Sequence, residues 1–260
     1  MKSVALIKDA RGFYWIPELA GRGIIGLFTT RRYDYALARG QARSRLCRSL
    51  GIPAANLVGM GQVHGAAVAV IKQQAPGRRG NVPLVVPEKD AAITGLNRRA
   101  LTVVTADCLP VILVDQQRAA VGIAHAGWRG LSNGVLANTV SAMRRALGCK
   151  PSGLEAFIGP GIRACCYQVG AQLRQYFQSG MRQRGGAWYL DLVAVAARQL
   201  ARAGVPQTQV FDTQRCTACD PEFFSYRRGD RRARMLSLVM RQEQGGVGSA
   251  CRVKNLDRET

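Results

Sequence analysis

Residues 101–130, LTVVTADCLPVILVDQQRAAVGIAHAGWRG, carry the pattern from which the fold follows. They contain three short apolar runs separated by polar residues, at 101–105, 111–114 and 119–124. Runs of this length that are rich in β-branched residues and bounded by polar turns are typical of strands. The stretch therefore predicts three strands, with Cys108 in the first polar turn and His125 at the end of the third strand, before a glycine-rich corner.

The chain contains only two histidines, and both lie beside a glycine near the end of a predicted strand. His64 occurs in GQVHG and His125 in HAGWRG. Two neutral imidazoles and a thiolate are good zinc ligands, and three protein ligands leave a fourth position open, as in catalytic zinc sites. We therefore predict a site made of His64, Cys108 and His125. The alternative interpretation is two hydrogen-bonded histidines at turns and a buried core cysteine.

Length and composition indicate one large domain rather than two small ones, because 260 residues that are 47% hydrophobic provide a substantial core. No apolar run approaches the roughly 20 residues of a membrane span, and no export signal is evident. We therefore expect a cytoplasmic protein without membrane association. In that compartment the eight cysteines are expected to be reduced thiols.

The net charge of +21 is the unusual bulk property of the chain. Such a charge attracts anions and promotes non-specific binding of nucleic acid. The arginines are scattered without interleaved aromatic residues, which favours a solvated basic surface and no specific nucleic-acid partner. The exception is a cluster after the aromatic run 223–226, which is suited to binding phosphate or forming a pocket rim. Its members are Arg227, Arg228, Arg231, Arg232 and Arg234.

Further elements are predicted along the rest of the chain. Strands are expected at 3–7, 24–29, 57–64, 66–72, 90–94, 154–158, 209–212 and 235–240. Helices are expected at 34–50, with Asp34 as N-cap, and at 132–147, 170–179 and 190–203. Residues 73–87 carry Gly, Pro and paired arginines and are predicted to form a loop or insertion. The alternation of strands and helices favours an α/β or mixed α+β fold.

Two other groups of residues offer weaker candidates for a site. Cys216 and Cys219 have the spacing of a zinc knuckle, but without an evident second pair we favour a coincidental pair near a turn. Cys165 and Cys166 are adjacent, so a packing role is expected rather than convergence on one ion. Trp128 and its neighbouring arginine form either a stacking platform with a phosphate anchor or a packed corner.

Five motifs, in this order, resemble the YfiH/laccase-domain family, also called the multicopper polyphenol oxidase family. They are QVHG, TADCLPV, AHAGWRG, IGPGIRACCYQVG, and CT followed by FFSYRR, and they extend from about residue 24 to residue 240. The resemblance implies a single domain at 1–241 with four layers, α/β/β/α, and mixed sheets. It also implies a zinc site made of His64, Cys108 and His125. The segment 242–260 is expected to be a polar and disordered tail.

The resemblance implies activity on purine nucleosides. The implied reactions are phosphorolysis of adenosine, inosine, guanosine and methylthioadenosine, and hydrolytic deamination of adenosine, by a monomer or homodimer. Phosphate requires an anion site, for which Arg129, Arg163 and Arg227 are candidates, and Trp128 is a candidate substrate contact. Asp107 is expected either to orient the site or to transfer a proton.

The sequence departs from the family pattern at three places. The FTTRR segment lacks its usual Gly-rich, Asn-containing continuation, and the basic segment 73–87 is inserted. Gln168 replaces the Glu that is common in the CYEVG motif. These differences concern substrate contacts and leave the metal ligands in place.

The same residues and the same net charge are compatible with three other functions. A cysteine hydrolase, acting for example on peptidoglycan precursors, would use Cys108 as nucleophile and His125 as base. A copper-dependent polyphenol oxidase is disfavoured because two histidines are too few for a blue-copper centre and a multinuclear cluster. A non-enzymatic nucleic-acid binder is suggested by the charge alone.

Overall fold

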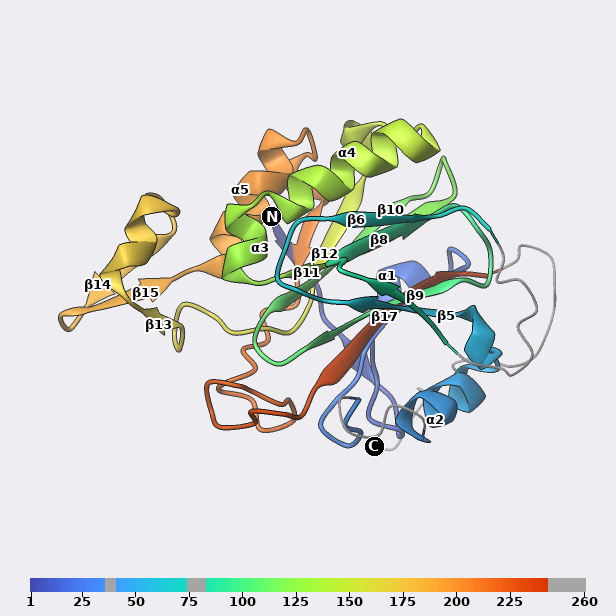
Figure 1. Cartoon of the computed structure of the whole chain (residues 1–260), viewed down its shortest axis with the longest axis horizontal. Coiled ribbons are helices and arrows are strands. Elements are labelled where there is room, and N and C mark those ends of the chain that lie inside the picture. The colour runs from blue at the N-terminus through green and yellow to red at the C-terminus, as the bar shows by residue number, and fades with distance from the viewer. Residues whose placement is uncertain (36–40, 74–82, 243–260) are drawn as a thin grey trace, which may run out of the picture.

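Two seven-stranded mixed sheets lie face to face, and helices cover their outer faces (Figure 1). This computed structural model describes residues 1–35, 41–73 and 83–242. The order of layers is α/β/β/α, as the family resemblance implied, with α4 and α5 on one outer face and α2 on the other.

The first sheet has the strand order β1-β16-β12-β10-β11-β8-β6. The antiparallel neighbours of β10 are β11 and β12, whereas β6 and β8 run parallel. The bounds are β1 Lys2–Ser3, β6 Val68–Ile71, β8 Ala91–Thr94, β10 Leu109–Asp115, β11 Ala120–Ala126, β12 Glu155–Ile158 and β16 Val210–Asp212. Every residue of β10 and β11 is buried, because both faces of these central strands are covered.

The second sheet has the order β2-β3-β4-β17-β9-β5-β7. Its strands are β2 Ile7–Lys8, β3 Tyr14–Trp15, β4 Ile24–Phe28, β5 Leu57–Gly61, β7 Leu84–Pro87, β9 Ala100–Thr105 and β17 Met235–Arg241. The chain crosses to the first sheet between β5 and β6 and again between β9 and β10. His64 lies on the first of these connections and Cys108 on the second, so the topology brings both to the seam between the sheets.

Three hydrophobic clusters hold the layers together. One fills the space between the sheets and includes Val103, Ile112 and Phe157. Another lies under α4 and α5, and a third lies between the second sheet and α2, where Leu46 packs. Strands buried on both faces explain why the runs in 101–124 are continuously apolar rather than alternating.

The helices follow their amphipathic patterns and end at identifiable caps. Their bounds are α1 Pro17–Ala20, α2 Gln41–Leu50, α3 Trp128–Ser132, α4 Val135–Leu147 and α5 Leu192–Arg202. Short 3-10 turns are η1 Ala54–Asn56, η2 Pro151–Gly153, η3 Ala171–Gln175 and η4 Gln207–Gln209. Gly148 ends α4 in the left-handed conformation, with φ of 68°. The carboxylate of Asp191 accepts a hydrogen bond from the Ala194 amide and caps α5.

The helix predicted at 170–179 is wrong. Only η3 forms there, and it is followed by a hairpin of β14 (Met181–Arg184) and β15 (Ala187–Leu190) that pairs with β13 (Gln168–Val169). This three-stranded sheet projects from the main body in Figure 1. Gly185 and Gly186, with φ of 55° and 76°, form its turn, and paired glycines with positive φ are a hairpin signal.

Two other predictions need correction. The single strand expected at 3–7 is wrong, because β1 at Lys2–Ser3 lies in the first sheet and β2 at Ile7–Lys8 in the second. Leu84–Pro87 was expected in a loop but forms β7, parallel to β5, whereas 74–82 lie outside the described residues. Of the helix expected at 34–50, Gln41–Leu50 forms α2, and its start stays a prediction because 36–40 lie outside the described residues. The carboxylate of Asp34 accepts a hydrogen bond from the Arg234 amide, because it lies against the segment before β17.

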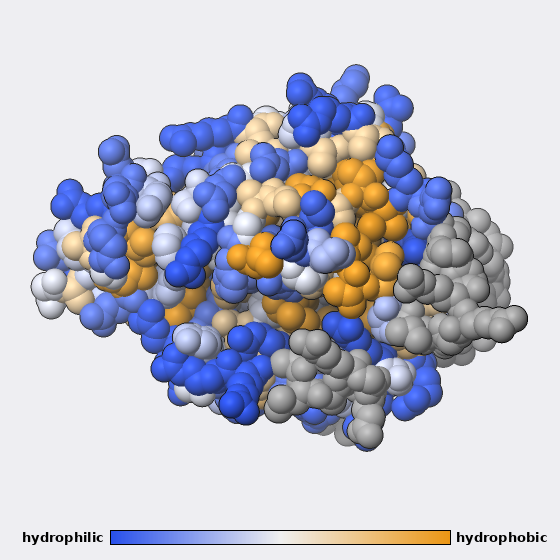
Figure 2. Space-filling model, in the orientation of Figure 1, coloured by the Kyte–Doolittle hydropathy of each residue, from blue (hydrophilic) through white to orange (hydrophobic). Residues whose placement is uncertain are grey.

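Hydrophilic residues cover most of the surface shown in Figure 2, and apolar residues are exposed over the edge strand β6. Among the described residues, no helix has the length and apolar character needed to span a membrane. The tail predicted at 242–260 lies outside the described residues from 243 onward and stays a prediction.

We predict that Ile112→Ala, in the cluster between the sheets, lowers the free energy of unfolding by about 2–5 kcal/mol, because it leaves a cavity in a fully buried site. The control is Val85→Ala on the exposed part of β7, with an expected change within about 0.5 kcal/mol. Denaturant unfolding measures both, and equal effects would contradict the proposed position of the core.

Candidate metal centre and active site

Two strand connections and one strand end bring the predicted ligands together. In the β10–β11 hairpin, Pro110 pairs with His125, so Cys108 lies just beyond the paired region, opposite Gly127. His64 enters from the β5–β6 connection, which crosses between the two sheets. The donor atoms of His64, Cys108 and His125 all lie within 4.8 Å of one another.

The site is closed on one side and open on the other. His125 is buried at 3% exposure, Cys108 is partly exposed and His64 is exposed. The two imidazole rings meet edge to face, with centroids 4.9 Å apart. A ligand therefore has access to the cluster from the side of His64.

Asp90, which the sequence interpretation did not single out, holds both histidines. Its Oδ1 lies 2.8 Å from His125 Nδ1, so the other ring nitrogen is left to face Cys108. Its carboxylate also accepts hydrogen bonds from the amides of Val63, His64 and Gly65, at 3.1, 3.0 and 2.7 Å. The side chain is fully buried. The sequence feature that could have identified Asp90 is its position directly before the run AAIT.

These contacts explain an unusual backbone conformation. His64 has φ of 60°, a left-handed conformation that a non-glycine residue adopts only when its surroundings enforce it. The three amides directed at Asp90 supply that constraint. His64 is therefore held by its backbone, while its ring stays at the solvent side of the cluster.

Cys108 and His125 form a charged pair in the metal-free protein. Burial alone raises the pKa of the Cys108 thiol, but the charge of His125 and hydrogen bonds from both histidines lower it to about 6. Burial alone lowers the pKa of His125, but the Cys108 charge and the hydrogen bond to Asp90 raise it to about 9. Near neutral pH the sulfur is therefore a thiolate, the form that binds metals and acts as a nucleophile.

Because Gly127 has no side chain, it leaves room for the side chains of Cys108 and His64. A Cβ atom at this position would lie 2.7 Å from Cys108 Sγ and 3.4 Å from the Cδ2 atom of His64. The glycine of HAGWRG is thus required by the close approach of backbone to ligand side chains.

Asp107 faces away from the cluster and anchors a neighbouring loop. Its Oδ1 accepts a hydrogen bond from the Thr217 hydroxyl and its Oδ2 from the Arg227 amide, both at 2.7 Å. Its φ is 91°, so the residue before Cys108 is itself held in a rare conformation. With both oxygens occupied by donors, Asp107 is placed to orient this connection.

The four candidate substrate contacts differ in their surroundings. Arg163 is nearly buried, forms an ion pair of 2.9 Å with Asp212 and donates to backbone carbonyls, so it stabilises the fold. Arg129 is exposed, with its guanidinium 4.5 Å from the centroid of the Trp128 ring. The Trp128 ring is partly buried and packs against the cluster under α4 and α5. Arg227 donates to the carbonyl of Gln168 at 2.7 Å.

The charges of two of these arginines and of Cys108 influence the ionisation of Tyr167. Burial and the negative charge of Cys108 raise the pKa of Tyr167 to about 12, whereas the charges of Arg227 and Arg129 oppose the rise. The Arg227 guanidinium lies 5.5 Å from the Tyr167 ring centroid. The charges of Cys108 and of both arginines therefore act on the same phenol group.

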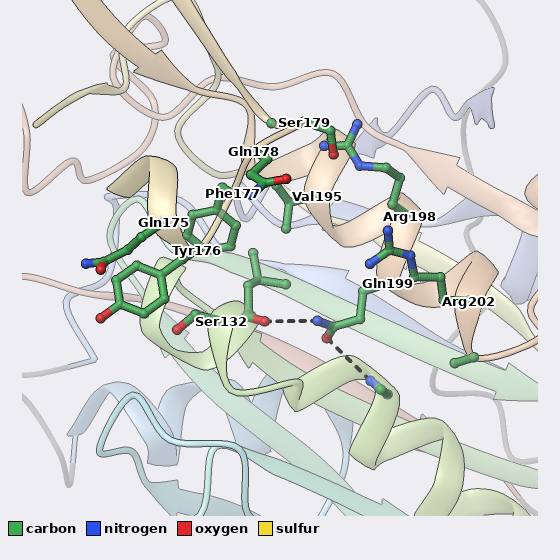
Figure 3. Close-up of a pocket in the computed structure, with 14 residues that line it drawn as sticks. Ser132, Gln175, Tyr176, Phe177, Gln178, Ser179, Val195, Arg198, Gln199 and Arg202 are labelled. Carbon is green, nitrogen blue, oxygen red and sulfur yellow. Dashed lines mark hydrogen bonds between the residues drawn. The ribbon is translucent and has the colours of Figure 1, made fainter. Parts of the chain in front are cut away.

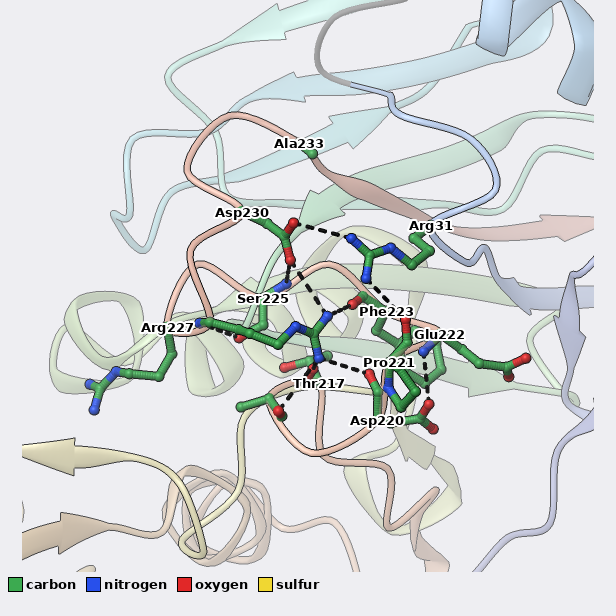
Figure 4. Close-up of polar contacts among 12 residues, drawn as sticks. Arg31, Thr217, Asp220, Pro221, Glu222, Phe223, Ser225, Arg227, Asp230 and Ala233 are labelled. Atoms are coloured by element: carbon green, nitrogen blue, oxygen red, sulfur yellow. Dashed lines mark hydrogen bonds and ion pairs between the residues drawn. The ribbon is translucent and has the colours of Figure 1, made fainter.

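Polar contacts hold the loop that carries Arg227 and Arg228 (Figure 4). The Arg228 guanidinium donates to a set of carbonyls, those of Thr217, Ala218, Asp220 and Phe223. The Asp230 carboxylate forms an ion pair with Arg31 and also accepts a hydrogen bond from the Ser225 amide. Arg228 and Asp230 thus hold the shape of this loop.

A pocket of about 700 Å³ lies apart from the histidine–cysteine cluster, between α3, η3 and α5 (Figure 3). Gln199 crosses its floor, with hydrogen bonds to the Leu131 carbonyl and the Leu136 amide. Tyr176 lines the pocket, and its ring centroid lies 6.1 Å from that of Trp128. None of the three predicted ligands lines this pocket.

The cluster fits a metal ion by its donor set. Two imidazoles and one thiolate converge, and one histidine is fixed by a carboxylate on its other nitrogen, a common arrangement around metal-bound histidine. Three protein ligands and an open side match a catalytic rather than a structural site. The geometry thus supports metal binding at the residues that the sequence selected.

Comparison with known proteins gives relatives over most of the chain. A family model described as multi-copper polyphenol oxidoreductase laccase matches residues 29–242. A protein of Xylella fastidiosa (strain Temecula1) named purine nucleoside phosphorylase is 38% identical over 208 residues, 76% of each chain. Purine nucleoside phosphorylase YfiH of Escherichia coli (strain K12) is 33% identical over 205 residues, 76% of this chain and 78% of that one.

Solved structures agree with these matches. YlmD from Geobacillus stearothermophilus superimposes with a TM-score of 0.83 and 29% identity, covering 92% of this chain and 100% of that one. A hypothetical protein YfiH from Bacillus licheniformis gives a TM-score of 0.82 and 26% identity, covering 91% and 99%. From the extent of these matches, this chain belongs to the multi-copper polyphenol oxidoreductase laccase family, with the YfiH and YlmD proteins among its relatives.

Proposed function

We propose that this protein is a zinc-dependent purine nucleoside enzyme that carries out phosphorolysis of adenosine, inosine, guanosine and methylthioadenosine and hydrolytic deamination of adenosine. The observation that carries the proposal is the convergence of His64, Cys108 and His125 at an open site. The names of the relatives, purine nucleoside phosphorylase, support the choice of reaction. Phosphorolysis consumes nucleoside and phosphate and yields free base and ribose 1-phosphate, whereas deamination consumes water and yields inosine and ammonia.

Zinc is proposed in preference to copper. The whole chain has two histidines, and both belong to this one cluster, so a multinuclear copper centre lacks ligands. A zinc ion held by the three side chains would act as a Lewis acid and lower the pKa of a water molecule at its open position.

The surrounding residues supply positioning and charge. Asp90 fixes the ring of His125 and the connection that carries His64, so it keeps the ligands preorganised. Arg129 is proposed to bind phosphate, because it is exposed and its guanidinium stacks on Trp128, the residue after the Gly127 that lies against Cys108. Trp128 is proposed to position this guanidinium and to border the nucleoside site.

We predict that metal-quantified protein converts adenosine to adenine when phosphate is present and to inosine without it, and that His125→Ala loses both activities. The control is Asp115→Asn, a buried carboxylate at the far end of β10 that accepts a hydrogen bond from the Arg118 amide. Chromatographic separation of the products measures each reaction. Full turnover by His125→Ala, or no product from protein with zinc bound at the cluster, would contradict the proposal.

Asp90→Asn is predicted to lower zinc affinity about 10- to 100-fold, because an amide nitrogen cannot accept the hydrogen bonds that the carboxylate receives. Chelator competition measures the affinity, and circular dichroism confirms that the variant is folded. Asp115→Asn serves again as the matched change. Unaltered affinity in a folded Asp90→Asn variant would show that this residue does not support the metal ligands.

Arg129→Gln is predicted to raise the KM for phosphate about tenfold or more while deamination is retained, since a charged hydrogen bond contributes about 1.5–3 kcal/mol. Arg174→Gln is the control, because Arg174 is also exposed over an indole ring, that of Trp188, but lies in the projecting sheet region. Steady-state kinetics with varied phosphate distinguish them. An equal loss of deamination in Arg129→Gln would assign Arg129 a general structural role instead.

A cysteine hydrolase is the second candidate, and one observation favours it. Cys108, His125 and Asp90 are linked by hydrogen bonds in the order of a nucleophile, a base and an orienting carboxylate. That reaction uses neither His64 nor a metal. The presence of a second histidine at the thiolate is the reason for preferring the zinc enzyme.

The pKa of Cys108 gives a test that separates the two candidates. In metal-free protein the thiolate is present above about pH 6 and lost below it, so alkylation of Cys108 is predicted to reach half its maximal rate near pH 6. Peptide mass spectrometry measures the modified fraction. Zinc is predicted to protect Cys108 and to restore activity, whereas full activity without metal that alkylation abolishes would establish the hydrolase.

A further inference from the structure

Four cysteines outside the candidate active site converge on one point. The sulfur atoms of Cys165, Cys166, Cys216 and Cys219 all lie within 4.8 Å of one another. The closest approaches are 3.2 Å between Cys166 and Cys219, 3.5 Å between Cys165 and Cys216, and 3.6 Å between Cys165 and Cys219. We call this group the four-cysteine cluster.

The four-cysteine cluster corrects the sequence interpretation, which expected a packing role for one pair and coincidence for the other. Two tight turns, one containing Cys165 and Cys166 and the other running from Cys216 to Cys219, face each other. A parallel bridge between Gly161 and Cys216 joins the two segments: the Gly161 amide donates to the Arg215 carbonyl, and the Gly161 carbonyl accepts from the Thr217 amide, both at 3.2 Å. Adjacent cysteines converge here because the chain turns at them, which linear spacing does not reveal.

The spacing fits one tetrahedral ion. Zinc–sulfur bonds of about 2.3 Å place tetrahedral sulfur ligands roughly 3.8 Å apart, close to the observed separations. A disulfide requires about 2.05 Å, so none of the four is paired with another. Multinuclear iron–sulfur clusters hold their thiolates farther apart than one ion does, which favours a mononuclear site.

Hydrogen-bond donors favour the thiolate at Cys216, whereas burial and the neighbouring sulfurs raise the pKa of the Cys165 and Cys166 thiols, whose protons a bound zinc ion would displace. Backbone amides of Arg163, Ala218 and Cys219 donate hydrogen bonds to the Cys216 sulfur. The guanidinium of Arg184 lies against the same turn and donates to the Cys165 carbonyl at 2.9 Å. Four thiolates around a divalent ion carry a net charge of about −2, which nearby cations and amide dipoles stabilise.

We propose that Cys165, Cys166, Cys216 and Cys219 bind one zinc ion in a structural site distinct from the His64–Cys108–His125 cluster. Four protein ligands leave no position open for substrate, which is the arrangement of structural rather than catalytic zinc. Binding releases the thiol protons that remain, because zinc coordinates the thiolate form.

The position of the four-cysteine cluster indicates what the ion stabilises. The hydroxyl of Thr217, within the second turn, donates a hydrogen bond to the carboxylate of Asp107, the residue before Cys108. The guanidinium of Arg227 contacts the carbonyls of Cys166 and Gln168 on the first turn. An ion that ties the two turns together therefore fixes the wall beside the active site.

Metal analysis of the full-length protein tests this inference independently of any activity. Purified, zinc-equilibrated protein is predicted to hold two zinc ions per chain, and Cys219→Ala and Cys165→Ala are each predicted to hold one. These two cysteines are exposed, so the substitutions leave the hydrophobic core intact. His64→Ala is also predicted to hold one ion, lost from the other site. Cys149→Ala, a buried cysteine outside both groups, is the control and is predicted to keep both.

Cobalt substitution identifies which site remains. In His64→Ala the cobalt protein is predicted to show the intense sulfur-to-metal charge-transfer absorption of four thiolate ligands, and in Cys219→Ala the weaker absorption of a single thiolate. One ion per chain in the unaltered protein that Cys219→Ala does not remove would overturn the proposal. Mass spectrometry that finds disulfides among the four cysteines of freshly purified, zinc-equilibrated protein would also overturn it.

Discussion

The carboxylate of Asp90 is the constraint that maintains the candidate site. It is fully buried at the start of β8, next to the strand that ends in His125, and it faces the connection that brings His64 across from the other sheet. Burying a carboxylate is costly unless its oxygens are hydrogen-bonded, and here three amides and an imidazole satisfy them. The same contacts hold the left-handed conformation of His64 and the ring orientation of His125. Asp90 thus connects the two packed sheets to the side chains of His64 and His125, which lie beside Cys108.

The sequence predicted the central strands, the α/β/β/α layers implied by the family resemblance, and the group His64, Cys108 and His125. The strands and the layers are confirmed, since β10 and β11 are buried on both faces. The three side chains lie together as the scarcity of histidine indicated, and their role as metal ligands stays a prediction. Asp90 was missed because an acidic residue before a strand resembles an ordinary turn residue. The hairpin around Gly185 was missed although its paired glycines are a local turn signal, because β14 has the sequence MRQR and is mostly exposed, so it lacks the apolar run of a strand. The four-cysteine cluster joins positions about 50 residues apart, which only the tertiary fold reveals.

The loops beside the site form a connected support rather than a set of free basic residues. Arg228 is engaged with backbone carbonyls, Arg163 with Asp212, and Asp107 with Thr217 and an amide. Arg228 and Arg163 therefore maintain loop geometry, while Arg129 is exposed and stacks on Trp128. Gln168, which stands where the family commonly has Glu, is exposed on β13. Its backbone carbonyl accepts a hydrogen bond from Arg227. The departure from the family pattern thus lies at the rim and leaves the ligand cluster unchanged.

X-ray absorption at the zinc edge of Cys219→Ala protein examines the proposed catalytic metal in isolation, because the His64–Cys108–His125 cluster is then the proposed remaining zinc site. We expect two nitrogen ligands at about 2.0–2.1 Å and one sulfur at about 2.3 Å, with a further light atom completing the coordination. Substituting His125 with alanine in the same background should remove the bound zinc. A coordination shell of several sulfur atoms, or zinc that persists without His125, would contradict the assignment of this cluster as the metal centre.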